Sequence, residues 1–399
     1  MRNYKSPTKL AKSLAIASKA QGIDLIYFNH SGVDIKSKKI HGKIYINNKW
    51  NDITTDIPKL VDVSQFCFKK KYKEIMDYLV KVTKLSDNNT GKINKMKLQR
   101  ELKKDKSFSD LVIPTQKVKS FQTIEDIINK YNVIVLKPLG GSFGDNIYMC
   151  EKTSGEMYKV TYENIESEFN ASDFKSFYIQ KIKDKKYIIQ KYIDSTTIQG
   201  HPFDCRINME KDSNGNWVLA KNFIRIGIGQ KTVSNISKGG GVSSTKPFLE
   251  ANFKSKRKSI EKKLNFIAET LPQKVEFLKG FNLMILGIDV GIDKNGDVYI
   301  FEINGSPGTS QLNYEAALYR SQYYKYVLEH ELNMKTNGYI SDFTAKELQN
   351  YINKQVEQNA FFKNKCELVS KELNKVYDST SWKITKPLRY IGNVLKRKK

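Results

Sequence analysis

The sequence predicts an α+β protein with more than one domain, and two groups of residues at strand ends carry most of its chemistry. An apolar run ends in Lys137 and is followed by a glycine-rich turn that reaches Gly144. Two later apolar runs carry three oxygen-bearing side chains, Asp289, Glu302 and Asn304. A lysine beside flexible backbone amides suits a polyphosphate, and oxygen donors suit the Mg²⁺ that accompanies it. Together, and in this order, they predict an ATP-using enzyme.

Composition sets the broad class. A chain of 399 residues is long enough for two or three domains. Its hydrophobic content of 39% is typical of a globular protein, and its formal charge of +26 favours anionic partners. General solubility explains this charge as well as a specific partner does. Nucleic acid is not an expected partner, because no recognisable reading motif accompanies the charge.

Cysteine usage and hydropathy favour a cytoplasmic protein. The four cysteines are scattered without Cys-x-x-Cys spacing, which argues against a zinc site or a disulfide framework. No apolar run approaches the roughly 18–20 residues needed to span a bilayer. The apolar run over residues 10–19 is interrupted by Lys12 and Lys19, so it predicts a helix ending at Gly22 rather than a signal peptide.

The first predicted domain, residues 1–88, is a small α/β unit. After the N-terminal helix, short strands are expected at 23–28, 43–46 and 60–63, followed by a Lys-rich helix at 69–85. The polar loop over residues 86–91 is typical of a domain boundary.

The second predicted domain, residues 89–330, alternates helices with the strands of one continuing sheet. Helices are expected at 92–104, 123–131, 254–270 and 311–334. Strands are expected at 133–137, 148–150, 156–161, 177–179, 187–193, 203–210, 217–226, 283–293 and 298–303. Turns rich in Asn and Gly at 212–216 and 294–297 predict two hairpins.

Residues 331–399 change in character and predict a helical extension. Residues 342–377 have the spaced apolar positions of a long polar helix. The tail from Lys383 carries seven basic residues and no acidic ones, with Trp382 and further apolar residues between them. Such a segment is typical of contact with an anionic membrane surface, and a disordered basic tail is the alternative.

The turn after Lys137 lacks the Walker A order, because its lysine precedes its glycines. Gly140, Gly141 and Gly144, with Ser142 between them, allow backbone N–H groups to approach phosphate oxygens. A glycine-rich hairpin with a surface lysine is an equally acceptable interpretation of this segment alone.

Glu302 and Asn304 are two residues apart in a predicted strand, so their side chains share a face. A carboxylate is costly inside an apolar strand unless it has a partner. With Asp289 nearby, the set predicts ligands for Mg²⁺. A structural ion pair at a strand end is the alternative.

Three further positions are polar within predicted strands or loops. Gln190 suits a base edge or a neighbouring backbone group. Arg206 shares a strand face with Asp204, and together with Arg225 it suits an acid or a transferring phosphoryl group. A cross-strand Asp–Arg pair explains the same residues equally well. The loop at 238–241 is either a substrate lid or an ordinary connection.

The ordered set of short motifs resembles the ATP-grasp superfamily, and within it the YheC/YheD-like group. The resemblance covers roughly residues 8–330. The pieces that carry it are Asn94–Lys95, Ile113–Thr115, Leu136–Pro138 with Gly141–Gly144, Tyr187–Gln190, Phe203–Arg206, Ile224–Gly227, Gly287–Asp289 and Phe301–Gly308.

In this superfamily two α+β subdomains clamp ATP between them, and the resemblance implies a role for each matched residue. Gly144-Asp145-Asn146 departs from the common Gly-x-Gly and puts an acidic residue beside the expected phosphate site. The implied contacts are Lys95, Lys137, Gly140, Gly141, Ser142 and Gly144 with phosphates; Gln190, Lys191 and Ile193 with adenine; Lys137, Arg206 and Arg225 with the transferring phosphoryl group; and Asp289, Glu302 and Asn304 with Mg²⁺.

The resemblance implies an activity as well as a fold. Most members join a carboxylate to an amine through an acyl phosphate, with ATP and Mg²⁺. The tail Ser379–Arg389 resembles the ending of bacterial glycosyltransferases of surface-polysaccharide synthesis, which implies a cell-surface glycan substrate at the inner membrane face. One alternative is a ligase that forms a dipeptide or a peptide-tailed small molecule. The other is a coat or structural protein with a relict nucleotide site.

Overall fold

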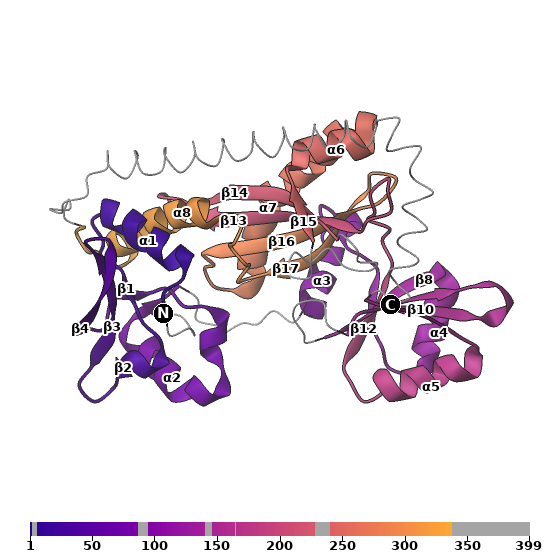
Figure 1. Cartoon of the computed structure of the whole chain (residues 1–399), viewed down its shortest axis with the longest axis horizontal. Helices are drawn as coiled ribbons and strands as arrows, with labels where there is room; N and C mark the ends of the chain where they lie inside the picture. The colour runs from indigo at the N-terminus through magenta and orange to yellow at the C-terminus, as the bar shows by residue number, and fades with distance from the viewer. Residues whose placement is uncertain (2–5, 87–94, 140–145, 164, 228–239, 337–399) are drawn as a thin grey trace, which may run out of the picture. The chain divides into compact units, whose positions relative to one another are not determined.

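The computed structural model describes residues 1, 6–86, 95–139, 146–163, 165–227 and 240–336 (Figure 1). The chain divides into two compact units, Met1–Gly338 and Tyr339–Lys399. The expected helix at 342–377 and the basic tail fall in the second unit, outside the described residues. Helices and mainly antiparallel sheets mix in the first unit, which confirms the α+β class. The division into 1–88, 89–330 and 331–399 stays a prediction.

The N-terminal part combines two helices with a four-stranded sheet, and its core joins Phe28 and Ile40 of the sheet region to Met76 and Leu79 of the second helix. The first helix ends before Gly22, whose φ of 76° suits glycine, as predicted. The elements are α1 (Lys9–Ala20), β1 (Ile26–Tyr27), β2 (Val33–Asp34), β3 (Lys39–Ile46), β4 (Lys49–Asp56), β5 (Leu60–Val61), α2 (Lys73–Val82) and β6 (Lys84–Leu85).

The middle of the first unit is a six-stranded sheet in the order β11-β10-β9-β8-β12-β7. Its core packs Ile124 and Ile128 of one helix and Phe174 of another against Ile134 and Leu136 of the strand that leads to Lys137. The elements are β7 (Thr115–Lys117), α4 (Phe121–Tyr131), β8 (Val133–Pro138), β9 (Tyr148–Lys152), β10 (Tyr158–Tyr162), β11 (Ile165–Phe169), α5 (Ala171–Lys181) and β12 (Tyr187–Lys191).

The strand predicted at 177–179 is wrong, because these residues lie inside α5. The side chain of Asn170 accepts a hydrogen bond from the backbone N–H of Asp173 and begins the helix. Phe174 and Tyr178, four residues apart, then lie on the same buried helix face. This helical spacing outweighs the strand propensity of the Phe-Tyr-Ile triplet.

The remaining strands form a separate five-stranded sheet in the order β15-β14-β13-β16-β17, so the predicted single sheet is divided between β12 and β13. Helix α7 covers one face of this sheet and is longer than predicted, since it continues through the buried Pro272 to Gly280. The elements are α3 (Lys95–Lys104), β13 (Phe203–Lys211), β14 (Trp217–Ile226), β15 (Gly241–Ser243), α6 (Thr245–Phe253), α7 (Arg257–Lys279), β16 (Ile285–Ile292), β17 (Val298–Asn304) and α8 (Asn313–Tyr326).

Helix α8 connects the five-stranded sheet to the N-terminal part of the same unit. It packs along α1 and also contacts β13 and β14, as Figure 1 shows. A π-helical turn, Val327–Glu331, extends it. Among the helices within the described ranges, none combines the length and the apolar character needed to cross a bilayer.

Candidate functional site

One face of the five-stranded sheet carries a row of polar side chains. On β13, the odd-numbered residues 203–209 belong to the core with α7, and the alternate residues point to the opposite face. Those alternate residues are Asp204, Arg206, Asn208 and Glu210, and each is less than 10% exposed. A buried polar row of this kind is costly unless its members have partners.

Two arginines and two carboxylates in this row form one network. Arg206 lies opposite Asp289, and Arg225 lies opposite Asp204, in the strand register. Nη2 of Arg206 lies 3.0 Å from Oδ2 of Asp289, and Nη2 of Arg225 lies 3.0 Å from its Oδ1. Arg225 also donates its Nε–H to Oδ1 of Asp204 over 2.6 Å. The cross-strand pairs that were an alternative interpretation are therefore present.

Burial and charge act in opposite directions on this network. Burial alone raises the pKa of Asp289, but the guanidinium groups of Arg206 and Arg225 outweigh it and hold that pKa below its usual value. Burial lowers the pKa of Arg225, whereas Asp289 and Asp204 together raise it above its usual value. Asp289 and Arg225 are therefore both charged at neutral pH.

A β-bulge in β17 places Glu302 and Asn304 on the same face as Asp289. Asp289 pairs with Glu302 but the next residue, Val290, pairs with Ile300, so Phe301 is an extra residue. Ile300 remains in the core with α7. Without the bulge, Glu302 would share the core face of Ile300. The bulge places its carboxylate on the opposite face and so avoids the free-energy cost of burying it in the core.

The bulged residue also brings Lys137 to this row. The ring of Phe301 lies over Gly291, where a Cβ atom would approach Cζ of the ring to 1.9 Å. Nζ of Lys137, at the end of β8, lies 5.8 Å from the centre of the same ring. The end of β8 therefore lies beside β17, the strand that also carries Glu302 and Asn304.

The strand predicted to line adenine is buried as expected. Gln190 is 2% exposed and its Nε2 donates a hydrogen bond to Oγ1 of Thr115 over 2.8 Å, so its amide is held by a side chain of β7. Ile193 is also buried. Nζ of Lys191 lies 6.0 Å from the ring centre of Tyr131.

Several predicted phosphate contacts lie outside the described residues. These are the backbone and side chains of Gly140, Gly141, Ser142 and Gly144, together with Asp145, and the side chain of Lys95 at the start of α3. Their roles stay predictions.

The oxygen donors fit Mg²⁺ in part. Both oxygens of Asp289 accept hydrogen bonds from arginine, so this carboxylate binds a cation only after an arginine leaves. Asn304 donates its Nδ2 to Asp289 over 3.4 Å, which turns its carbonyl oxygen away. Glu302 and Asn304 add a second carboxylate and an amide oxygen on the same face. Among the described residues no three acidic, His or Cys side chains form a metal cluster. One or two carboxylates with the phosphates of a nucleotide satisfy Mg²⁺.

Two residues of this face were not predicted. Asn208 is 1% exposed, and neither its Nδ2 nor its Oδ1 has a hydrogen-bond partner. Alternation along β13 from Arg206 was a signal that placed it on the polar face. No sequence signal marked Phe301 as a bulge, because the shift depends on the space over Gly291.

The segment that contains the polar row, the lysine at the end of β8 and the buried glutamine strand matches a known family. Residues 86–334 match the family described as "YheC/D like ATP-grasp", which covers more than half of the chain. The chain belongs to this family. The expected ATP-grasp fold is thereby confirmed, and membership of an ATP-grasp family implies use of ATP and Mg²⁺.

Two curated relatives come from Bacillus subtilis (strain 168). The endospore coat-associated protein YheD is 24% identical over 316 residues, which is 75% of this chain and 68% of YheD. The endospore coat-associated protein YheC is 23% identical over 301 residues, which is 73% of this chain and 82% of YheC.

Solved structures of other proteins are similar at lower sequence identity. D-cycloserine synthetase DcsG is 15% identical, with a TM-score of 0.40 over 67% of this chain and 83% of DcsG. The ATP-grasp ligase PsnB, complexed with a minimal precursor, is 11% identical, with a TM-score of 0.44 over 81% of this chain and 97% of PsnB.

Proposed function

We propose that this ATP-grasp protein is an ATP- and Mg²⁺-dependent ligase that joins a carboxylate to an amine. The observation that carries the proposal is the contact between Lys137 and the ring of Phe301. Phe301 is the bulged residue of β17, the strand that also carries Glu302 and Asn304. A polyphosphate between these residues would lie beside a cation from one sheet and oxygen donors from the other.

The proposed reaction has two steps. An oxygen of the substrate carboxylate attacks the γ-phosphorus of ATP, and ADP leaves. The amine nitrogen then attacks the acyl carbon, phosphate leaves, and the nitrogen loses a proton to give the amide. The reaction needs no side-chain nucleophile.

The residues of this chain would neutralise charge and hold the reactants. Lys137 would contact the phosphates, and Arg206 and Arg225 would face the transferring phosphoryl group. Nη1 of Arg206 is directed over Gly287, where a Cβ atom would lie 3.5 Å from it, so Arg206 has donors beyond those used by Asp289. Bound Mg²⁺, held by Glu302 and Asn304 and after exchange by Asp289, would supply charge neutralisation on the phosphates.

The substrate proposal is a uronic acid of a bacterial cell-surface polysaccharide or its precursor, joined to an amino acid or amino alcohol. It is supported by the resemblance of Ser379–Arg389 to the ending of surface-polysaccharide glycosyltransferases. The same basic segment supports a cytoplasmic protein at the inner face of the membrane. The alternative acceptor is a small molecule that gains a peptide bond, in which case removal of the tail leaves cellular function intact.

The first experiment measures phosphate release from ATP and Mg²⁺ against a panel of uronic acids and amino acids. We expect release that requires both an acid and an amine, and that is lost in Glu302→Ala. Glu269→Gln, an exposed carboxylate on α7, is the matched control and should keep full activity. Failure of the protein to bind ATP at millimolar concentration with Mg²⁺ would contradict the proposal.

A second candidate is a non-catalytic coat protein with a relict nucleotide site. It is favoured by the names of the two relatives from Bacillus subtilis and by the pairing of Asp289 with two arginines. In that case Lys137→Ala and Glu302→Ala both leave the cellular phenotype unchanged.

A further inference from the structure

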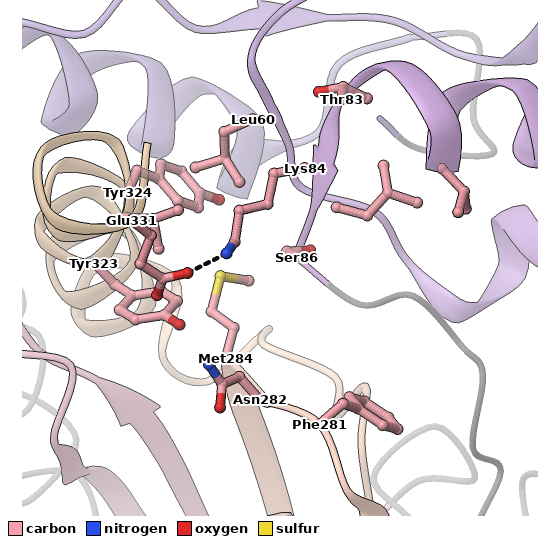
Figure 2. A pocket seen from close by; sticks show the side chains of 13 residues that line it. Leu60, Thr83, Lys84, Ser86, Phe281, Asn282, Met284, Tyr323, Tyr324 and Glu331 are labelled. Carbon is pink, nitrogen blue, oxygen red and sulfur yellow. Dashed lines mark hydrogen bonds and ion pairs between the residues drawn. The ribbon is translucent and has the colours of Figure 1, made fainter. Parts of the chain in front are cut away.

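A cavity of about 330 Å³ lies between the β6 region and helix α8, away from the Asp289 end of the polar row (Figure 2). Met284, in its wall, immediately precedes β16 and comes five residues before Asp289. At about 3.3 Å per strand residue the two positions are roughly 17 Å apart. A small molecule in this cavity therefore cannot react at the site described above.

The wall of the cavity has a mixed character, with apolar and polar atoms contributing nearly equal surface. Leu60, Val80, Met284 and Val327 supply aliphatic surface, and Tyr323 and Tyr324 supply rings from α8. The volume lies at the lower end of the range for sites of small organic ligands. A wall of mixed character suits a ligand that has both charged and apolar parts.

Some polar groups of the wall already have partners. The hydroxyl of Tyr324 donates to Oδ2 of Asp62 over 2.6 Å, and the hydroxyl of Ser86 donates to Oδ1 of the same carboxylate over 3.1 Å. Thr83 donates to the backbone oxygen of Pro58. These hydrogen bonds fix the wall and leave ligand recognition to other side chains.

The cavity contains one positive and one negative side chain, Lys84 and Glu331, and they form an ion pair within it (Figure 2). Their side chains are 38% and 21% exposed. A purely anionic ligand that takes Lys84 would leave Glu331 unpaired in a half-buried place, and a cationic ligand would do the same to Lys84. A charge left in that position is costly.

We propose that this cavity binds a free α-amino acid with an apolar side chain. Its carboxylate pairs with Lys84 and its ammonium with Glu331, so that both charges of the protein keep a partner. The side chain packs against Leu60 and Met284. Both Lys84 and Glu331 have flexible stems, which allows them to separate around the two charged groups of the ligand. This site does not depend on the proposed ligase activity.

The test uses the full chain without ATP and measures ligand binding by calorimetry. L-leucine is compared with leucinol, which lacks the carboxylate, with N-acetyl-L-leucine, which lacks the ammonium, and with glycine, which lacks the apolar side chain. We expect leucine to bind at least tenfold more tightly than each of the three. Equal binding of leucinol or N-acetyl-L-leucine overturns the proposal, as does an absence of binding by leucine, methionine and phenylalanine at millimolar concentration.

Two variants sharpen the test by reversing the preference. Lys84→Met should weaken leucine binding about tenfold and strengthen leucinol binding, because only the carboxylate of Glu331 remains. Glu331→Gln should weaken leucine and strengthen N-acetyl-L-leucine. Lys39→Met removes an exposed ion pair with Asp56 elsewhere in the N-terminal part and should change neither. If a variant does not fold, the ligand series on the unchanged protein decides the question.

Binding and catalysis are read separately. If leucine does not bind but ATP-dependent phosphate release is intact, only the proposal of an amino-acid site is contradicted. If leucine binds but no phosphate is released, only the proposal of ligase activity is contradicted.

Discussion

Individual side chains on the polar face of the five-stranded sheet differ in whether they have hydrogen-bond or ionic partners. Asp204, Arg206 and Glu210 of β13 all have ionic partners, but Asn208 between them has none for either amide atom. A buried amide without hydrogen bonds reduces stability by about 1–3 kcal/mol.

We expect Asn208→Leu to increase the free energy of unfolding by about 1 kcal/mol, because it removes two unsatisfied atoms and keeps a similar volume. Asn208→Ala should lower stability, because it opens a cavity. Urea denaturation with an unchanged slope is the measurement. A clear loss of stability in Asn208→Leu would show that the amide has partners that matter.

Replacement of Asp289 is expected to lower stability, in contrast to Asn208→Leu. Asp289→Asn removes the carboxylate that two buried arginines share, and we expect it to reduce the free energy of unfolding by about 3–5 kcal/mol. Asp297→Asn, at the exposed turn of the same hairpin, breaks an ion pair with Lys263 and should cost less than about 1 kcal/mol.

The cost of Asp289→Asn should depend on pH in a defined direction. Because the pKa of Asp289 is held below the ordinary value of 3.8, its contribution is complete above pH 3.8 and is lost as the pH falls further. Urea denaturation of both proteins from neutral to acidic pH should therefore show a gap that narrows only below pH 3.8. A gap that narrows above that pH contradicts the assignment.

At the scale of elements, the two hairpins of the five-stranded sheet could be predicted from the sequence. The division of the strands between the six-stranded and the five-stranded sheet could not. The turns at 212–216 and 294–297 have Asn-Gly signals, and β13, β14, β16 and β17 form as expected. Strand β4 was missed, because Lys49–Asp56 is mostly polar and half exposed. The separation of β12 from β13 depends on packing against different helices, which a single strand pattern does not record.

The bulge in β17 is an element-scale feature that can be tested through Gly291. A Cβ atom in Gly291→Ala would overlap the ring of Phe301, so the ring must move away from Lys137. We expect ATP affinity to fall about tenfold, about 1.4 kcal/mol, with no change in helix content. Gly308→Ala is the matched control, since a Cβ atom there meets nothing within 4 Å. Equal affinities for the two variants would contradict the role of the ring.

At the scale of the whole described unit, buried polar links connect the N-terminal part to the second sheet. Arg320 of α8 donates to both oxygens of Glu210, with both side chains at most 3% exposed. Burial raises the pKa of Glu210 to about 7 and Arg320 opposes that rise. Four residues along the same helix, Tyr324 holds Asp62 of the N-terminal part.

We expect Arg320→Met to reduce the free energy of unfolding by about 3–5 kcal/mol, because it leaves Glu210 buried without a partner. The double variant Glu210→Met, Arg320→Met should recover most of that loss, since two apolar side chains replace the pair. Urea denaturation of the two variants is the measurement. A double variant no more stable than Arg320→Met would show that the pair stabilises more than it costs to bury.

The candidate site was foreseeable in its residue types and not in its arrangement. The sequence placed Asp289, Glu302 and Asn304 on neighbouring strands, because alternation and strand order are local properties. It did not show that Arg206 and Arg225 would both pair with Asp289, because that depends on the register of three strands.

The bulge at Phe301 also determines which changes in chain length this strand tolerates. Removal of Phe301 would give a regular strand in which Glu302 still faces outward and Ile300 still faces α7. Removal of Ile303 instead would turn Asn304 into the core. Related chains that lack one residue here are therefore expected to lack it at the bulge, and to combine an intact set of oxygen donors with a lysine at the end of β8 that has lost this ring contact.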